Sequence, residues 1–232
     1  MALTDSLVSY WKLDEASGDA TDSHGSNTLT DNNTVGSTTG KINNGRLFTN
    51  GNTEYFSHAD NADLSTGDID FSFSAWIKPA SFTNYWSIVD KWTDANNEYL
   101  IWNEATNSKL NWIVKSSGGV STNIEWATAL SANTWYFVVV WHDSVNNVIG
   151  MSIDDATPQT AAHTLGVFDG GSSFWLGRGG GGGDYDGVMD EVGFWKRVLT
   201  SGERTQLYNS GAGLAYPFVS GPRMLASLGV GT

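Results

Sequence analysis

Short segments in which hydrophobic and polar residues alternate recur along the chain, roughly every ten residues, with turn-forming residues between them. The clearest is residues 71–77 (FSFSAWI), where every second side chain is hydrophobic and Pro79 follows. A period of two places successive side chains on opposite faces of a strand. Many short strands with little helix between them predict an all-β fold of two packed antiparallel sheets.

Two pairs of these segments are expected to form hairpins. Residues 98–102 precede residues 110–115, and residues 135–141 precede residues 148–153, with turn-forming residues between the members of each pair. Residues 135–141 form a continuous hydrophobic run, which is typical of a strand that is covered on both faces.

One short C-terminal helix is expected. Thr200 and Glu203 have the spacing of a capping box, and Gly211 is a suitable left-handed stop. We predict a single domain over residues 1–218. Residues 219–232 are rich in small and apolar residues and form a C-terminal tail, which we interpret as a possible docking segment.

Composition narrows the classes of partner. The 232-residue chain has no cysteine, so disulfides and thiolate metal sites are excluded. A formal net charge of −13 would repel a nucleic-acid backbone, and it suits binding of Ca²⁺. No segment approaches the roughly 18 apolar residues of a membrane span. The N-terminal residues lack the basic and apolar stretches of a signal peptide.

Two motifs carry a family resemblance. Residues 7–18 (LVSYWKLDEASG) and residues 187–199 (GVMDEVGFWKRVL) resemble the opening and closing motifs of laminin-G-like jelly rolls of the concanavalin A-like lectin/glucanase superfamily. The resemblance extends over residues 7–218. It implies two curved antiparallel sheets in which the strands at the two ends of the chain lie together, and it implies carbohydrate or protein ligands.

The resemblance also implies a structural calcium ion that joins the first loop to the last strands. Its ligands would be Asp190, Asp22 and the carbonyl oxygen of Gly45. Calcium takes six to eight oxygen ligands from carboxylates, carbonyls and water. The alternative is that Asp22 forms an Asx-turn and Asp190 caps backbone N–H groups.

Aromatic residues next to turns are candidates for a glycan-binding platform. These are Trp86, Trp92 and Tyr185, the last of which lies in a loop between Asp184 and Asp186. Sugar rings stack their C–H faces on aromatic rings, and their hydroxyls bond to carboxylates. The alternative is that most tryptophans of such a sandwich lie in its core.

No catalytic activity is expected. Glycoside hydrolases of this superfamily resemble one another in a strand with paired carboxylates, Glu-x-Asp-x-x-Glu, and the chain has no such sequence. The four histidines lack metal-ligand spacing, and no Gly-x-Ser-x-Gly motif occurs.

The sequence therefore predicts a non-catalytic recognition or adhesion domain with a glycan or a protein surface as its ligand. The alternative is a structural virion component, such as a phage decoration or fibre protein, or a surface-assembly protein. In that case a capsid or a second copy of the chain would bind the tail. Either function places the protein outside the cell or on a virion surface.

Overall fold

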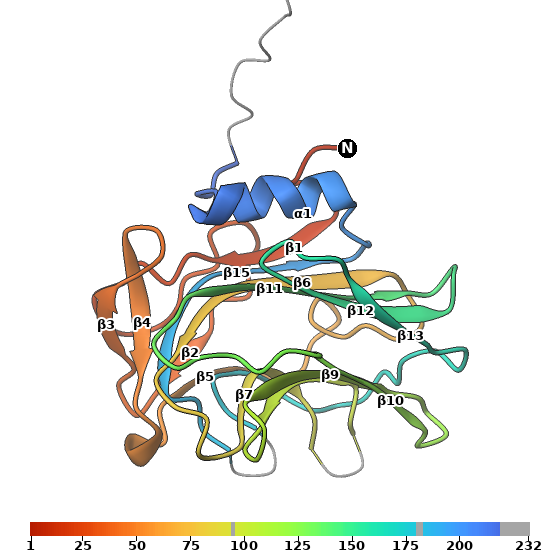
Figure 1. Cartoon of the computed structure of the whole chain (residues 1–232), viewed down its shortest axis with the longest axis horizontal. Coiled ribbons are helices and arrows are strands. Elements are labelled where there is room, and N and C mark those ends of the chain that lie inside the picture. Colours follow the sequence, from red (N-terminus) through yellow and green to blue (C-terminus); the bar gives the residue numbers. More distant parts are fainter. Residues whose placement is uncertain (94–95, 180–182, 219–232) are drawn as a thin grey trace, which may run out of the picture.

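The chain folds into two antiparallel sheets packed face to face, with one α-helix on the outer face of one sheet (Figure 1). The structure is a computed structural model that describes residues 1–93, 96–179 and 183–218. The predicted all-β sandwich with one short C-terminal helix is confirmed. The tail 219–232 and its docking role lie outside the described residues.

One sheet has eight strands and contains both ends of the domain. Its order is β13 (Gln159–Ala162), β12 (Val148–Ile153), β11 (Tyr136–Asp143), β6 (Phe71–Pro79), β15 (Gly187–Trp195), β4 (Asn44–Phe48) and β3 (Gly36–Thr39), and β1 (Leu7–Trp11) also pairs with β15. Leu7 lies opposite Trp195, and Trp11 lies opposite Val192. The expected pairing of the two terminal motifs is confirmed.

The second sheet has seven strands. Its order is β10 (Ser121–Glu125), β9 (Lys109–Lys115), β8 (Tyr99–Glu104), β7 (Trp86–Lys91), β14 (Phe174–Leu176), β5 (Tyr55–His58) and β2 (Thr30–Asn32). The strands β8 and β9 form one expected hairpin, and β11 and β12 form the other.

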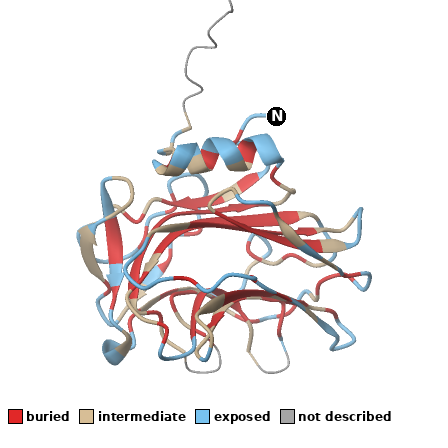
Figure 2. Ribbon diagram, viewed as in Figure 1, coloured by how far each residue is buried: buried red, intermediate tan, exposed pale blue. Residues whose placement is uncertain are grey.

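Aromatic side chains fill the space between the sheets. Phe73 of β6 stacks on Phe194 of β15 with ring centroids 4.3 Å apart, and Trp11 stacks on Phe174 of the opposite sheet at 5.3 Å. Figure 2 shows buried residues along the strands of both sheets. The alternating sequence pattern explains this interior, because the hydrophobic side chains of a strand point to the same face of the sheet.

The helix α1 (Ser201–Tyr208) covers the outer face of the eight-stranded sheet. The capping box is present: Glu203 donates its backbone N–H to Thr200 Oγ1, and the Thr200 N–H returns a hydrogen bond to Glu203 Oε2 at 2.8 Å. Tyr208 stacks on Trp76 of β6. The left-handed residue that ends the helix is Asn209 (φ 48°) rather than Gly211, which is the last residue of the 3₁₀ turn η2 (Asn209–Gly211).

Close packing of the outer face generates a prediction at Gly150. This residue of β12 lies opposite Trp141 of β11, and a Cβ atom at position 150 would overlap the Trp141 indole. Overpacking of this kind costs about 1–3 kcal/mol. We expect Gly150→Ala to lower the free energy of unfolding by that amount in urea denaturation. Gly171→Ala is the control, because nothing lies within 4 Å of its Cβ position. Equal stability of both variants would contradict the packing.

Candidate functional site

The outer face of the seven-stranded sheet carries a row of buried and partly buried side chains. Trp175 of β14 lies opposite Asp90 of β7, Asp90 lies opposite Leu100 of β8, and Leu100 lies opposite Ile113 of β9. Directly opposed residues of antiparallel strands point to the same face. The alternate residues of β8, among them Tyr99, point into the core. The row therefore lies on the side of the sheet that faces away from the sandwich interior.

A cavity of about 180 Å³ opens on this face. Its lining is Tyr85, Trp86, Ser87, Asp90, Trp92, Leu100, Trp102, Gly179 and Gly183. This volume corresponds to about six water molecules of liquid, which is the size of a single small ring rather than of a long ligand.

Aromatic rings form the walls of the cavity. The rings of Tyr85 and Trp102 stack at 5.8 Å with an angle of 27° between their planes. Tyr85 is 53% exposed, and its hydroxyl donates a hydrogen bond of 2.9 Å to Glu104 Oε1. On another wall, Lys115 Nζ lies 5.5 Å from the centroid of the Trp92 ring. These contacts hold the rings in place before any ligand binds.

Polar groups lie beneath these rings. Asp90 is 1% exposed, and its Oδ1 accepts the backbone N–H of Trp92 at 2.8 Å, which fixes the start of the loop that carries Trp92. Ser87 lies opposite Trp102 in the β7–β8 pairing. The cavity therefore combines apolar walls with a carboxylate and a hydroxyl, a combination that suits a ring with C–H faces and hydroxyl groups.

A second aromatic group lies beside the cavity on the same face. Tyr55 of β5 and Trp175 of β14 have ring centroids 6.2 Å apart. The Arg178 guanidinium carbon lies 4.6 Å from the Tyr55 ring centroid and 5.5 Å from that of Trp175. The backbone connects this group to the cavity, because Gly179 is part of the cavity lining.

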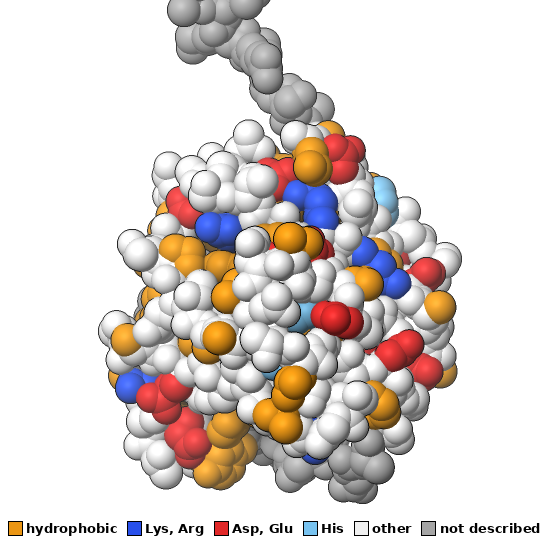
Figure 3. Space-filling model, turned by 90° about the vertical axis from the view of Figure 1, so that its right-hand side faces the viewer, with side chains coloured by type: hydrophobic (Ala, Val, Ile, Leu, Met, Phe, Trp, Pro, Cys, Tyr) orange, Lys and Arg blue, Asp and Glu red, His pale blue; other side chains and the backbone are white. Residues whose placement is uncertain are grey.

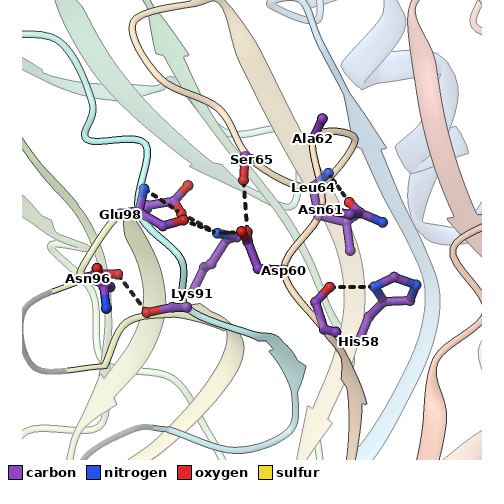
Figure 4. Close-up of polar contacts among 12 residues, drawn as sticks. His58, Asp60, Asn61, Ala62, Leu64, Ser65, Lys91, Asn96 and Glu98 are labelled. Atoms are coloured by element: carbon purple, nitrogen blue, oxygen red, sulfur yellow. Dashed lines mark hydrogen bonds and ion pairs between the residues drawn. The ribbon is translucent and has the colours of Figure 1, made fainter.

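An ionic network braces one end of the β7–β8 hairpin (Figure 4); its Lys91 and Glu98 are buried, and its Asp60 is exposed. Lys91 Nζ contacts the Glu98 carboxylate and lies 2.7 Å from Asp60 Oδ1. Ser65 donates a hydrogen bond to Asp60, and Gly170 N–H donates one to Glu98. Burial raises the pKa of Glu98 to about 7, against the opposing effect of Lys91. The network connects a loop after β5 to the hairpin that supports the cavity.

The end of the sandwich drawn in Figure 3 differs from the cavity face. There, hydrophobic, acidic and basic side chains are interspersed rather than gathered by kind. The cavity is therefore the stronger candidate for a ligand site.

The structure separates the five residues predicted for a glycan platform. Trp92 lines the cavity. Trp86 also lines it, but its indole lies in the core and donates to the Ser81 carbonyl at 3.0 Å. Tyr185 is fully buried, with its ring 5.0 Å from that of Trp86, so it is a core residue and not part of an exposed platform. Asp184 and Asp186 are absent from the described lining.

Tyr85 and Trp102 form one wall of the cavity and are not among the five predicted residues. The signal for Trp102 was present: it lies one residue from each of two inward-facing residues of β8, so the period of two places it outside. Tyr85 directly precedes Trp86, and adjacent residues at a strand end point to different sides.

Asp22 is fully engaged by the backbone. Its Oδ1 accepts the N–H groups of Tyr10, His24 and Gly25, and its Oδ2 accepts that of Asn27. Burial alone would raise its pKa, but these four donors hold the pKa below its ordinary value. This is the capping arrangement given above as the alternative to calcium binding. Asp22 therefore has little capacity left for a metal ion.

Asp190 differs from Asp22, because only one of its oxygens is engaged. Its Oδ2 accepts the N–H groups of Lys41 and Ile42 at 2.7 and 2.8 Å, while Oδ1 is buried without a hydrogen-bond partner. The adjacent Glu191 is buried as well: neither of its oxygens accepts a hydrogen bond of regular geometry, although the Tyr10 hydroxyl and the Tyr216 backbone N–H lie close enough to act against the rise in its pKa. Burial raises the pKa of Asp190 to about 8 and that of Glu191 to about 7.

The remaining predicted ligand is Gly45, where β4 packs closely on β15: a Cβ atom there would lie 3.0 Å from the Met189 carbonyl oxygen. Across the part of the chain that the structure describes, no three His, Cys, Asp or Glu side chains come together as a metal site. A calcium ion would therefore need backbone and water oxygens in addition to carboxylates.

The family assignment follows from a match to residues 50–203. This region matches the model of the concanavalin A-like lectin/glucanases superfamily, and the chain belongs to that family. The resemblance seen in the terminal motifs is thereby confirmed. No curated protein matches the chain.

Two solved structures with the same fold are binding domains of toxins. The binding domain of Paraclostridial Mosquitocidal Protein 1 superposes with a TM-score of 0.76 and 16% identity, over 90% of this chain and 53% of that chain. The ligand-binding domain of botulinum neurotoxin D in complex with N-acetylneuraminic acid gives 0.67 and 16%, over 89% and 51%. This chain spans about half the length of these toxin domains.

A neighbour of similar size is domain 4 of an extracellular arabinanase from Geobacillus stearothermophilus, in complex with arabinotriose. Its TM-score is 0.63 at 16% identity, and the match covers 89% of this chain and 98% of that chain. At such identities the likeness establishes the fold alone. Among the residues that the structure describes, no helix is long and apolar enough to cross a membrane.

The ionic network generates a prediction with a defined pH dependence. Lys91→Met leaves Glu98 buried without its cation, and we expect a loss of about 3–5 kcal/mol in unfolding free energy at pH 8. The pKa of Glu98 is raised on folding, so the stability linked to this group is present at low pH and is lost as pH rises through about 7. The loss should therefore be smaller at pH 5.

Urea denaturation at pH 5 and pH 8 measures this difference. Lys91→Met/Glu98→Gln removes both charges and should flatten the dependence on pH. Lys109→Met is the control, because its ion pair with Glu125 is partly exposed and should contribute no more than about 1 kcal/mol. A loss in Lys91→Met that is equal at both pH values would show that Glu98 does not ionise in this range.

Proposed function

We propose that the domain is a non-catalytic carbohydrate-binding domain whose ligand enters the cavity on the outer face of the seven-stranded sheet. The observation that carries the proposal is the cavity itself, with Tyr85, Trp92 and Trp102 as aromatic walls over Asp90. One sugar ring matches its volume. The C–H faces of the ring pack on the aromatic walls, and the ring hydroxyls lie next to the polar part of the lining.

The structural neighbours support a sugar as the ligand. The arabinanase domain was solved with arabinotriose, and a neurotoxin binding domain was solved with N-acetylneuraminic acid. Both share the sandwich architecture, so the fold is compatible with glycan recognition. The specific sugar differs between these proteins, which is expected because function depends on the residues placed on the fold rather than on the fold itself.

The lining of the cavity supports binding rather than hydrolysis. Retaining glycosidases need two carboxyl groups about 5 Å apart, and inverting enzymes need two that are wider apart. The described lining contains one carboxylate, Asp90, which also holds the Trp92 backbone. If the ligand is a glycan, the domain would bind to an extracellular polymer or to a cell surface. The virion and capsid roles, in which residues 219–232 would dock, stay predictions.

The experiment is a glycan array followed by calorimetry on the strongest ligand. Trp102→Ala and Trp92→Ala each remove a wall of the cavity, and we expect each to weaken binding by at least about 2 kcal/mol, or roughly thirtyfold. Trp135→Ala is the matched control, because Trp135 packs on the opposite outer face near the helix. No glycan binding by the wild type, or equal losses in all three variants, would contradict the proposal.

We also propose a structural calcium ion at Asp190, with Glu191 as a further carboxylate. The support is Asp190 Oδ1, which is buried without a hydrogen-bond partner, beside the buried Glu191 carboxylate, which Tyr10 and Tyr216 compensate only in part. A cation would remove the cost of burying these charges. When bound, the ion would join the closing strand to the backbone around it. The unengaged oxygen of Asp190 and the two of Glu191 are the groups that would hold it.

Thermal unfolding in EDTA and in millimolar calcium tests this ion. At a hundredfold excess over its Kd, a ligand that binds only the folded state adds about 2.7 kcal/mol, or roughly 5–10 °C for a domain of this size. Asp190→Asn should abolish the increase, and Asp22→Asn should retain it. Equal melting temperatures with and without calcium would leave Asp190 as a backbone cap.

A further inference from the structure

Arg178 is a partly exposed cation beside the candidate cavity. Its side chain is 35% exposed, and its closest carboxylate contact is a long one of 3.9 Å from Nε to Asp184 Oδ1. Among the described residues the guanidinium donates no hydrogen bond, although arginine has five N–H donors. The rings of Tyr55 and Trp175 hold it in place from below. A fixed guanidinium with free donors is prepared to bind an anion.

Arg178 also lies next to the cavity. Trp175, on which the guanidinium rests, is the direct cross-strand neighbour of Asp90, and adjacent strands are about 4.8 Å apart. Gly179, the next residue along the chain, lines the cavity. A ligand whose first ring fills the cavity therefore brings its neighbouring sugar over the Tyr55–Trp175 pair.

The charges around this position define the kind of anion. Asp90 and Asp184 are acidic groups near the guanidinium, and the chain has a formal net charge of −13. A densely sulfated polymer would be repelled by this field. A single planar carboxylate needs only one arginine, because the guanidinium fork matches it with two parallel hydrogen bonds. Lys115, on the other side of the cavity, adds a second positive charge to the same face.

We propose that the ligand is a weakly charged acidic glycan: one sugar ring occupies the cavity, and the carboxylate of the adjoining sugar binds Arg178. This inference rests on the proposed function, since it assigns a second subsite to the same face. The carboxylate can belong to a uronic acid or to a sialic acid, because Arg178 would form the same two hydrogen bonds with either one. The two sources are separated by the choice of probes.

The experiment compares acidic glycans with matched neutral ones. The probes are trigalacturonate and 3′-sialyllactose, each paired with its own methyl ester and measured by calorimetry at low and moderate salt. We expect the wild type to bind the acidic member of one pair between about tenfold and a hundredfold more tightly. That preference should shrink as salt rises, because this face is partly exposed. The pair that shows it identifies the source of the carboxylate.

Variants separate this subsite from the cavity. Arg178→Met keeps a long side chain over the rings and should abolish the acidic preference while the neutral probe still binds. Arg178→Lys keeps the charge without the planar fork and should retain only part of the preference. Lys109→Met is the control for net charge, because it removes one cation elsewhere on the same sheet and should leave the preference unchanged. Thermal unfolding of each variant confirms that it is folded.

The outcomes of the two proposals differ. If Trp102→Ala abolishes binding but Arg178→Met leaves the acidic-to-neutral ratio unchanged, the second subsite is wrong and the cavity stands. If Arg178→Met and Lys109→Met reduce the ratio equally, the effect is one of net charge and the subsite is again wrong. If the wild type binds neither member of either pair, the acidic-glycan inference is overturned. The proposed function is tested separately, by whether the wild type binds any glycan on the array.

Discussion

The strand β15 is buried on both of its faces, and the arrangement of the molecule depends on this burial. All nine of its residues are buried, between the strands β6, β4 and β1. One face contributes Phe194 to the core between the sheets, and the other places Trp195 beneath the helix. A strand with two apolar faces cannot lie at the surface. The helix α1 and the segment that follows it are therefore required as a cover.

This cover is present on one side only. Among the described residues, the single α-helix lies on the eight-stranded sheet, and the outer face of the seven-stranded sheet has no comparable layer (Figure 1). Strands such as β8 consequently alternate between core residues and partly exposed ones. The partly exposed set includes the aromatic residues of the cavity. The position of the candidate site thus follows from which sheet is covered, and its chemistry follows from which residues occupy the open face.

The sequence predicted the fold well because its signals are local. The alternation at residues 71–77 and the terminal motifs each determine a strand, and pairing of the ends follows. The site was harder to predict because exposure at a turn is not a local property. Tyr185 lies between two aspartates and is nevertheless fully buried, while Trp102 lies inside a strand and borders the cavity. The difference in exposure between Tyr185 and Trp102 depends on how the two sheets pack, which the local sequence does not reveal.

The described ends of the domain lie together on the helix-covered side. Tyr216 stacks on Tyr10 of β1 at 5.0 Å, and the cavity opens on the opposite sheet. Both described ends therefore lie on the side of the domain away from the open face. A cavity that holds one ring provides modest affinity, since each ligand atom contributes a limited amount of free energy. Several such domains on one support would rebind a repetitive polymer at a high effective concentration, and avidity rather than single-site affinity would set the strength of attachment.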